Sequence, residues 1–421
     1  MPDPATLTAT EAARSIRNGR LTPADLVEAC LARIAERDPT VRAMAFVDPA
    51  LVRAAVSRAR GGPVHGLPIG IKDVLDTADM PTEYGSPIWR RYQPRADAAS
   101  VAWARAAGGL VIGKTVTTEF AVRTPGPTTH PRDPGRTPGG SSSGSAAGVA
   151  AHFFPLAFGT QTAGSIIRPA AFCGVVGYKP SFGMLPRLGM KLMSESLDTI
   201  GVMARSVADC ALFAGAVARR DLGDPDARPE RAPRIGICRS PTWSCAAPET
   251  RALLESLAGP LSRAGAAVVE RELPETFSAI VDAHPLVQHA EGAQSMGWEL
   301  AHHRSEISAT LLTLLDRGLA TAALDLEAAR SVLRDRRATF SAAMEGLDIL
   351  VTPAALGEAP QGLGSTGDAG FNFMWTSLHV PCVTVPAGSG PAGLPLGIQI
   401  VGRQGDDRAT LAWAQWVAAA A

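Results

Sequence analysis

The sequence is poor in the residues that mark several large classes of protein. Its six cysteines are scattered along 421 residues, and the closest two, Cys238 and Cys245, are seven positions apart. No Cys-x-x-Cys pair and no Cys/His cluster is present, which argues against a disulfide framework and against a structural zinc site. We therefore expect reduced thiols, no bound metal and no cofactor.

An excess of charge of one sign and a long apolar run are also missing. The 40 basic and 40 acidic residues cancel, so charge predicts neither a nucleic acid nor an anionic membrane as a partner. No uncharged apolar run reaches the roughly 18 residues of a membrane span. Residues 1–20 carry charges throughout, without the apolar core of a signal peptide. We expect a soluble cytoplasmic protein whose partner is a small molecule, with a homodimer as an open alternative to a monomer.

The composition is ample for a large core, with 46% hydrophobic and 19% charged residues. Near the start, Thr8 and Glu11 have the spacing of a capping box, which predicts a helix there. From His65 onward, short apolar runs alternate with helical patterns. This alternation favours an α/β fold with a large mixed, mostly parallel sheet covered by helices on both faces. Strands are expected at residues 67–74, 110–112, 153–158, 175–178, 235–238, 268–272, 348–352, 382–385 and 397–401.

We expect a single domain over residues 1–421, with four parts that differ in pattern. These are N-terminal helices at 1–60, a core at 61–210, a variable helical region at 211–340, and the C-terminal part of the sheet with a closing helix at 341–421. Residues 359–370, rich in glycine, are typical of a flexible loop.

One stretch, Pro138 to Pro180, concentrates the residues that suggest chemistry. Two glycine-rich turns that carry serines, 139–144 and 159–165, flank a segment of small residues. Glycine lets backbone N–H groups turn toward a ligand, and a serine on such a turn is exposed. The small residues of 141–152 suit a buried helix against which other backbones pack closely. The stretch indicates a site made of backbone donors and hydroxyls.

Three other interpretations of this stretch are weaker. A flexible Gly/Ser linker does not lead directly into an alanine-rich helix and a strand. The sequence Gly140-Ser141-Ser142-Ser143-Gly144 satisfies the G-x-S-x-G nucleophile elbow, but that motif needs a strand just before it, and a loop stands there instead. A phosphate-binding loop would end in G-K-[ST], which is absent here.

A lone lysine, Lys72, lies in the apolar run 67–74 upstream of this stretch. Burial lowers the pKa of a lysine and favours the neutral amine, which can act as a base. The alternative is a structural salt bridge between Lys72 and the adjacent Asp73, and the sequence leaves both possibilities open.

These segments together resemble the amidase signature family, the Ser-cisSer-Lys hydrolases. The resemblance rests on GIKD, PGGSSSGSAA and GTQTAGSIIRPAAFCGVVGYKPS, in this order. Ser141 and Ser165 are 24 positions apart and Lys72 precedes Ser141 by 69, spacings similar to those of malonamidase-type members. The match is dense over 65–210 and returns at 347–353 and 380–403.

The resemblance implies an α/β/α sandwich and assigns roles to residues by position. Ser165 would be the nucleophile, Ser141 the bridging serine on a cis peptide, and Lys72 the terminal base. The backbone N–H groups of Thr162, Ala163 and Gly164 would form the oxyanion hole. Arg168, Gly140 and Thr162 would contact substrate, with Arg168 binding a carboxylate or, alternatively, holding the loop through carbonyls or an internal acid.

The family often has Asp and Gly where this chain has Gln161 and Ala163. Gln161 is also found in malonamidase-like members, whereas Ala163 would be strained if its position required a positive φ.

The resemblance implies hydrolysis of the C–N bond of a small linear carboxamide through an acyl-enzyme, with release of ammonia or an amine. A carbamate, aryl-amide or ester hydrolase with the same triad is an alternative. A second alternative is a protein similar to the A subunit of an amidotransferase, which would need a partner that binds transfer RNA. A third is a catalytically silent relative that binds ligands.

Overall fold

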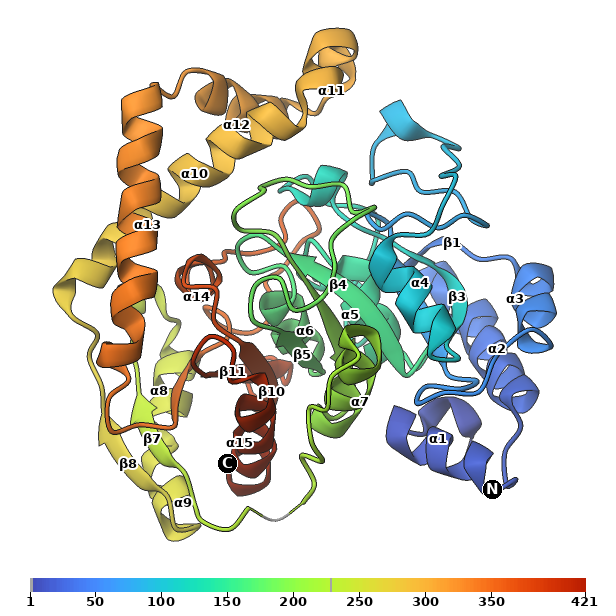
Figure 1. Ribbon diagram of the computed structural model, residues 1–421, viewed down its shortest axis with the longest axis horizontal. Coiled ribbons are helices and arrows are strands. Elements are labelled where there is room, and N and C mark those ends of the chain that lie inside the picture. The colour runs from blue at the N-terminus through green and yellow to red at the C-terminus, as the bar shows by residue number, and fades with distance from the viewer. Residues whose placement is uncertain (1–2, 228) are drawn as a thin grey trace.

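The computed structural model describes residues 3–227 and 229–421, and its centre is a single sheet of eleven strands (Figure 1). The strands are β1 Met44–Phe46, β2 Pro68–Lys72, β3 Leu110–Thr115, β4 Leu156–Gln161, β5 Val176–Lys179, β6 Thr199–Ala204, β7 Arg234–Ile237, β8 Ala267–Glu270, β9 Ile349–Pro353, β10 Cys382–Ser389 and β11 Pro395–Val401. Their order across the sheet is β1-β3-β2-β4-β6-β5-β10-β11-β9-β7-β8.

The sheet confirms the predicted α/β class and its mixed character, with one correction. All nine expected strands are present, while β1 and β6 were not predicted. The sheet is not mostly parallel: β2–β3, β2–β4, β7–β8 and β7–β9 pair in parallel, and the other six pairs are antiparallel. The cause is that β6 lies antiparallel between β4 and β5, and that the β10–β11 hairpin reverses the chain.

Fifteen α-helices are present in the described part of the chain, and the first begins at the predicted capping box. Thr8 accepts from the backbone N–H of Glu11, whose side chain accepts in return from Thr8. The helices are α1 Ala9–Arg17, α2 Pro23–Val41, α3 Pro49–Val56, α4 Ala99–Ala106, α5 Ser143–Ala150, α6 Ile167–Cys173, α7 Val207–Ala218, α8 Pro248–Ser256, α9 Ala258–Arg263, α10 Ile280–Ser295, α11 Gly297–His302, α12 Ala309–Leu319, α13 Ala323–Ala343, α14 Phe373–Ser377 and α15 Asp407–Ala420. None of the helices in the described ranges is long and apolar enough to cross a membrane.

Helices cover both faces of the sheet at its centre, as adjacent residues of β5 demonstrate. A Cβ on Gly177 would lie 2.7 Å from the Ala170 side chain of α6. The next residue, Tyr178, donates from its hydroxyl to Asp407 of α15 at 2.6 Å. Because successive side chains of a strand point to opposite faces, α6 and α15 lie on opposite sides of the sheet.

The small-residue helix α5 is buried, as predicted, and its glycines allow neighbouring segments to pack closely against it. A Cβ on Gly144 would lie 2.2 Å from the carbonyl oxygen of Ala43, and one on Gly148 would lie 2.3 Å from the Phe154 ring. Real Cβ atoms do not approach backbone at such distances, so larger residues at these positions would push α5 off the sheet. This packing places the N-terminus of α5, where Ser141 precedes the helix, against β2 and β4.

Strands β2 and β4 are parallel neighbours, with Ile69 opposite Leu156 and Gly70 opposite Ala157. Their carboxyl ends therefore meet at one edge of the sheet, where α/β proteins commonly place their sites. Lys72 ends β2, and the turn 162–165 follows β4 directly. The predicted site residues are brought to this edge. Helices α10 to α13 extend to one side of the sheet (orange in Figure 1).

Candidate active site

Lys72 is fully buried at the end of β2 and makes two short hydrogen bonds to hydroxyl groups. Its Nζ donates to Ser141 Oγ and to Thr160 Oγ1, both at 2.7 Å. Burial holds the pKa of Lys72 well below its ordinary value, and the negative charge of Asp198 opposes this shift. Desolvation with few compensating charges favours the neutral amine, which has a lone pair to accept a proton.

The alternative of a Lys72–Asp73 salt bridge is wrong. Asp73 instead pairs with a second buried lysine, Lys114 of β3, at 2.9 Å between Oδ1 and Nζ. Successive side chains of an extended strand point to opposite faces, which separates Lys72 from its sequence neighbour and pairs Asp73 across to β3. Lys72 is thus left without an ion-pair partner in the described ranges, while Lys114 has one.

Ser141 and Ser165 come together through the backbone. The Gly140–Ser141 peptide bond is cis, and the backbone N–H of Ser142 donates to the carbonyl oxygen of Ser165 at 3.4 Å. Both serine side chains line the same cavity. Lys72 contacts Ser141 directly, whereas no hydrogen bond joins the Ser141 and Ser165 hydroxyls in residues 3–227 and 229–421. Catalytic hydrogen bonds are often long in a free enzyme and shorten when substrate binds.

The turn between β4 and α6 is held at both ends by buried side chains. Gln161 Oε1 accepts from the backbone N–H groups of Ile166 and Ile167, at 2.8 and 3.0 Å, and Gln161 Nε2 donates to Thr376 Oγ1 at 2.9 Å. Thr376 Oγ1 in turn contacts the carbonyl oxygen of Ala163 at 2.8 Å. Ala163 is not among the residues with positive φ, so its methyl group introduces no backbone strain.

Asp198 is a buried carboxylate at this site that the sequence analysis missed. Its Oδ1 accepts from Thr162 Oγ1 at 2.5 Å, and its Oδ2 accepts from the backbone N–H groups of Met193 and Ser194. Burial raises the pKa of Asp198 to about 6, and these hydrogen bonds oppose the shift. Asp198 therefore anchors the turn that carries Thr162, and its charge acts on Lys72. Thr160, the second partner of Lys72, was also missed, although it lies within the serine-bearing turn 159–165.

We expect Asp198→Asn to lower kcat about tenfold and to move the acid limb of the pH profile. A hydrogen bond to a charged group is worth about 1.5–3 kcal/mol, and about 1.4 kcal/mol corresponds to a tenfold rate change. Removing the negative charge destabilises the protonated form of Lys72, so the pKa of Lys72 falls and the limb shifts to lower pH. The measurement is kcat/KM from pH 5 to 10.

Asp209→Asn is the matched control for this variant. Asp209 is also buried, but its Oδ1 accepts from the backbone and side chain of Thr10 in α1, away from the serine turns. It should reduce stability without moving the pH profile. Equal profiles for Asp198→Asn and the wild type would contradict the role given to Asp198.

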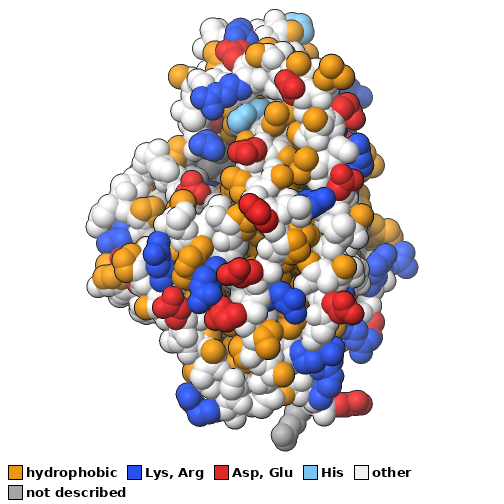
Figure 2. Space-filling model, turned by 90° about the vertical axis from the view of Figure 1, so that its left-hand side faces the viewer, with side chains coloured by type: hydrophobic (Ala, Val, Ile, Leu, Met, Phe, Trp, Pro, Cys, Tyr) orange, Lys and Arg blue, Asp and Glu red, His pale blue; other side chains and the backbone are white. Residues whose placement is uncertain are grey.

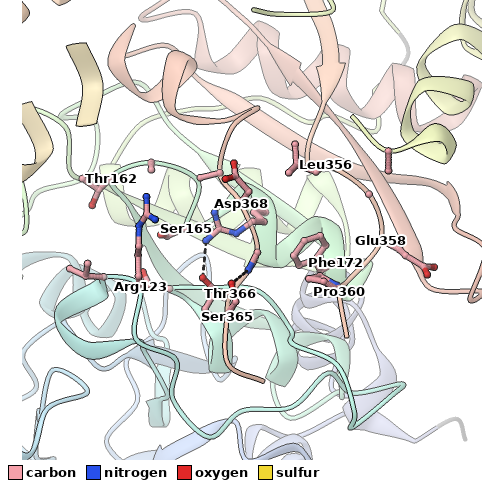
Figure 3. Close-up of a pocket in the computed structure, with 18 of the residues that line it drawn as sticks. Arg123, Thr162, Ser165, Phe172, Leu356, Glu358, Pro360, Ser365, Thr366 and Asp368 are labelled. Carbon is pink, nitrogen blue, oxygen red and sulfur yellow. Dashed lines mark hydrogen bonds between the residues drawn. The ribbon is translucent and has the colours of Figure 1, made fainter. Parts of the chain in front are cut away.

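The site opens into a cavity of ≈ 600 Å³, within the usual size of a small-ligand pocket. Figure 3 shows Ser165 and Thr162 on one side of it and the loop that contains Thr366 and Asp368 on the other. The glycine-rich loop 359–370 therefore forms a wall of the cavity. Of the predicted site residues, Ser141, Thr162, Ala163, Ser165 and Arg168 line the cavity, while Lys72, Gly140 and Gly164 do not.

Arg168 is buried beside Ser165 and uses one edge of its guanidinium to hold the surrounding loops. Its Nη2 donates to the carbonyl oxygen of Gly140 at 2.7 Å and to Thr366 Oγ1 at 3.3 Å. Its Nε is buried without a hydrogen-bond partner among the described residues. Burial lowers the pKa of Arg168 to about 10, and Asp368 opposes the shift. One edge of the Arg168 guanidinium therefore has the structural role that the sequence analysis gave as an alternative. The rest of the guanidinium makes no hydrogen bond to the described residues.

In comparison with known proteins, residues 25–411 match the amidase family. The chain belongs to the amidase family. "Putative amidase AmiD" of Mycobacterium tuberculosis (strain ATCC 25618 / H37Rv) is 32% identical over 94% of this amidase and 90% of its own length. The A subunit of the glutamyl-tRNA(Gln) amidotransferase of Roseiflexus sp. (strain RS-1) is 32% identical over 96% of this amidase and 94% of its own length.

The solved structures extend the likeness to the whole fold. The peptide amidase of Stenotrophomonas maltophilia is 31% identical, with a TM-score of 0.82, and the match covers 98% of this amidase and 96% of that chain. Family and structural neighbours together make this amidase a hydrolase of carbon–nitrogen bonds in amides.

Proposed function

We propose that this amidase cleaves the C–N bond of a small linear carboxamide through an acyl-enzyme on Ser165. The observation that carries the proposal is Lys72, a buried amine with a lowered pKa whose Nζ lies 2.7 Å from Ser141 Oγ. A serine hydroxyl is a poor nucleophile until a base removes its proton. Among the described residues, no other side-chain amine or imidazole is hydrogen-bonded to a serine that lines the cavity.

In the proposed reaction, protons move along the line from Ser165 to Lys72. Ser165 Oγ attacks the amide carbonyl and gives its proton to Ser141, which gives its own to the neutral amine of Lys72. The backbone N–H groups of Thr162, Ala163 and Gly164 stabilise the oxyanion. The proton returns through Ser141 to the leaving nitrogen, which departs as ammonia or an amine. Water then attacks the acyl-enzyme by the same route and releases the carboxylate.

The remaining proposed contacts position the substrate. Arg168 and Thr162 line the cavity next to Ser165, and Gly140 acts through its carbonyl oxygen, which accepts from Arg168. A guanidinium with an uncommitted edge suits a carboxylate, because it can bind both oxygens. This supports the carboxylate recognition that the malonamidase-type resemblance implies, in addition to the structural role of Arg168.

The test is covalent labelling with a fluorophosphonate combined with a substrate panel. We expect one phosphonyl group per chain, mapped to the peptide that contains Ser165, and release of ammonia from primary amides. The panel also contains a carbamate, an aryl amide and an ester, since the same acyl chemistry would act on each. Labelling of a different residue, or of none, would refute the Ser165 acyl-enzyme.

Similarity to amidotransferase A subunits favours one second candidate, a subunit that delivers ammonia to a partner. The net charge of zero offers no broad attraction to RNA, and acidic and basic side chains are interspersed on the face in Figure 2. Hydrolysis of simple amides by the isolated chain would favour the amidase, whereas activity only with co-purified subunits would favour the amidotransferase.

A further inference from the structure

A second arginine, Arg123, lines the same cavity as Ser165 and Arg168. Its side chain is exposed to solvent, and it forms no salt bridge with any residue in the described ranges. Figure 3 shows its guanidinium extending from the loop after Phe120 toward the space between Thr162 and Ser165. The repulsion between the two guanidinium groups contributes to the lowered pKa of Arg168. The cavity therefore holds two positive charges that act on each other.

The backbone that presents Arg123 adopts a conformation that ordinary residues avoid. Phe120 and Ala121 are consecutive non-glycine residues with positive φ, 46° and 60°. A residue with a Cβ adopts this left-handed conformation only at an energetic cost. Ala121, Val122 and Arg123 all line the cavity, so the strained turn aims this short segment at the site. Strained backbone of this kind is concentrated at binding and catalytic sites.

Three acids line the cavity, Glu249, Glu358 and Asp368, and in the described residues none of them forms an ion pair with Arg123 or Arg168. Glu358 is committed to Arg136, at 3.3 Å, and to the backbone N–H of Ala392. Asp368 accepts from the backbone N–H of Gly370 at 2.6 Å, and although its charge acts on Arg168, the two form no ion pair within 4 Å in the described part of the chain. A buried cation without a paired anion is costly, and an anionic ligand would relieve both this cost and the repulsion between the arginines.

We propose that Arg123 is a specificity-determining residue that, together with Arg168, holds a carboxylate group of the substrate. The substrate class is then a small amide that carries a free carboxylate, as in the monoamide of a dicarboxylic acid. Arg168 binds from the buried side of the cavity and Arg123 from its mouth. The cleavage of this substrate rests on the proposed function, but the carboxylate site itself can be tested without catalysis.

The first experiment measures binding to a Ser165→Ala chain, in which no turnover occurs. Calorimetric titration with succinate and glutarate should give saturable binding, and butyramide, which has no carboxylate, should bind at least tenfold more weakly. Adding Arg123→Gln should weaken dicarboxylate binding at least tenfold, and Arg123→Lys should restore part of it. The affinity should fall with rising salt, less steeply in Arg123→Gln. Arg95→Gln removes an exposed arginine that does not line the cavity and should leave binding unchanged.

The second experiment uses chains that keep Ser165. It compares the monoamide of succinic acid with butyramide as substrates. Arg123→Gln should raise KM for the acidic amide at least tenfold while leaving kcat/KM for butyramide within twofold. Equal dicarboxylate affinity with Arg123 or Gln at this position, or no dicarboxylate binding at all, would overturn the inference. If no amide is hydrolysed but dicarboxylates bind as described, the proposed function fails and the carboxylate site stands.

Discussion

Replacement of Ser165 by alanine is expected to abolish turnover and covalent labelling together. Removing the nucleophile of a serine hydrolase costs up to about 10⁶-fold in kcat, and a residual rate over water remains from the oxyanion hole. The change deletes one oxygen atom from a side chain that lines the cavity, so the fold should not be affected. The measurement is ammonia release from a primary amide at saturating substrate, together with mass spectrometry after fluorophosphonate treatment.

Two serines close to the site separate a loss of chemistry from a general effect of substitution. Ser365 lines the same cavity but is exposed, and in the described residues its hydroxyl accepts only from the backbone N–H of Gly367. Ser143 donates to the carbonyl oxygen of Gly139 within the motif of Ser141. Ser365→Ala and Ser143→Ala should both keep labelling and most of the activity. If Ser165→Ala is labelled and turns over like the wild type, Ser165 is not the nucleophile.

The sequence indicated which residues would meet at one edge of the sheet, but it did not indicate the direction of every strand. Lys72, Ser141 and Ser165 lie in short motifs with a fixed order, so the resemblance could point to each by position. The direction of a strand carries no such signal. The apolar run of β6 (Thr199–Ala204) has the same character as its neighbours, and only its pairing with β4 reveals that it is antiparallel. The prediction of a mostly parallel sheet failed for this reason.

Residues that reach the site from other segments were invisible in the sequence. Asp198 is 36 positions from Thr162, its hydrogen-bond partner, and precedes an ordinary strand. Arg123 follows a short turn whose positive φ values depend on tertiary contacts, because nothing in Phe120 or Ala121 favours that conformation. The choice for Lys72 between a neutral base and a salt bridge to Asp73 was also beyond the sequence, since Lys114, which pairs with Asp73, comes from another strand.

Replacement of Lys72 by methionine is expected to lower kcat/KM by roughly 10²- to 10⁴-fold, the usual contribution of a general base. Methionine keeps the length and the apolar stem of the side chain but has no lone pair on nitrogen. In the wild type the base must be neutral, so kcat/KM should rise with pH through the lowered pKa of Lys72 and then level off. In Lys72→Met this limb should disappear, because no group remains to titrate there.

Lys114→Met is the matched control, because Lys114 is an equally buried lysine that, unlike Lys72, has an ion-pair partner. It pairs with Asp73, so its loss leaves a buried carboxylate unpaired and should cost about 3–5 kcal/mol of folding free energy. Lys72 has no such partner in the described ranges, and burying a lone amine is itself unfavourable, so Lys72→Met should lower Tm far less. The two variants should therefore separate, with Lys114→Met reducing stability and Lys72→Met reducing activity. A wild-type pH limb in Lys72→Met would show that another group is the base, because the methionine side chain does not ionise.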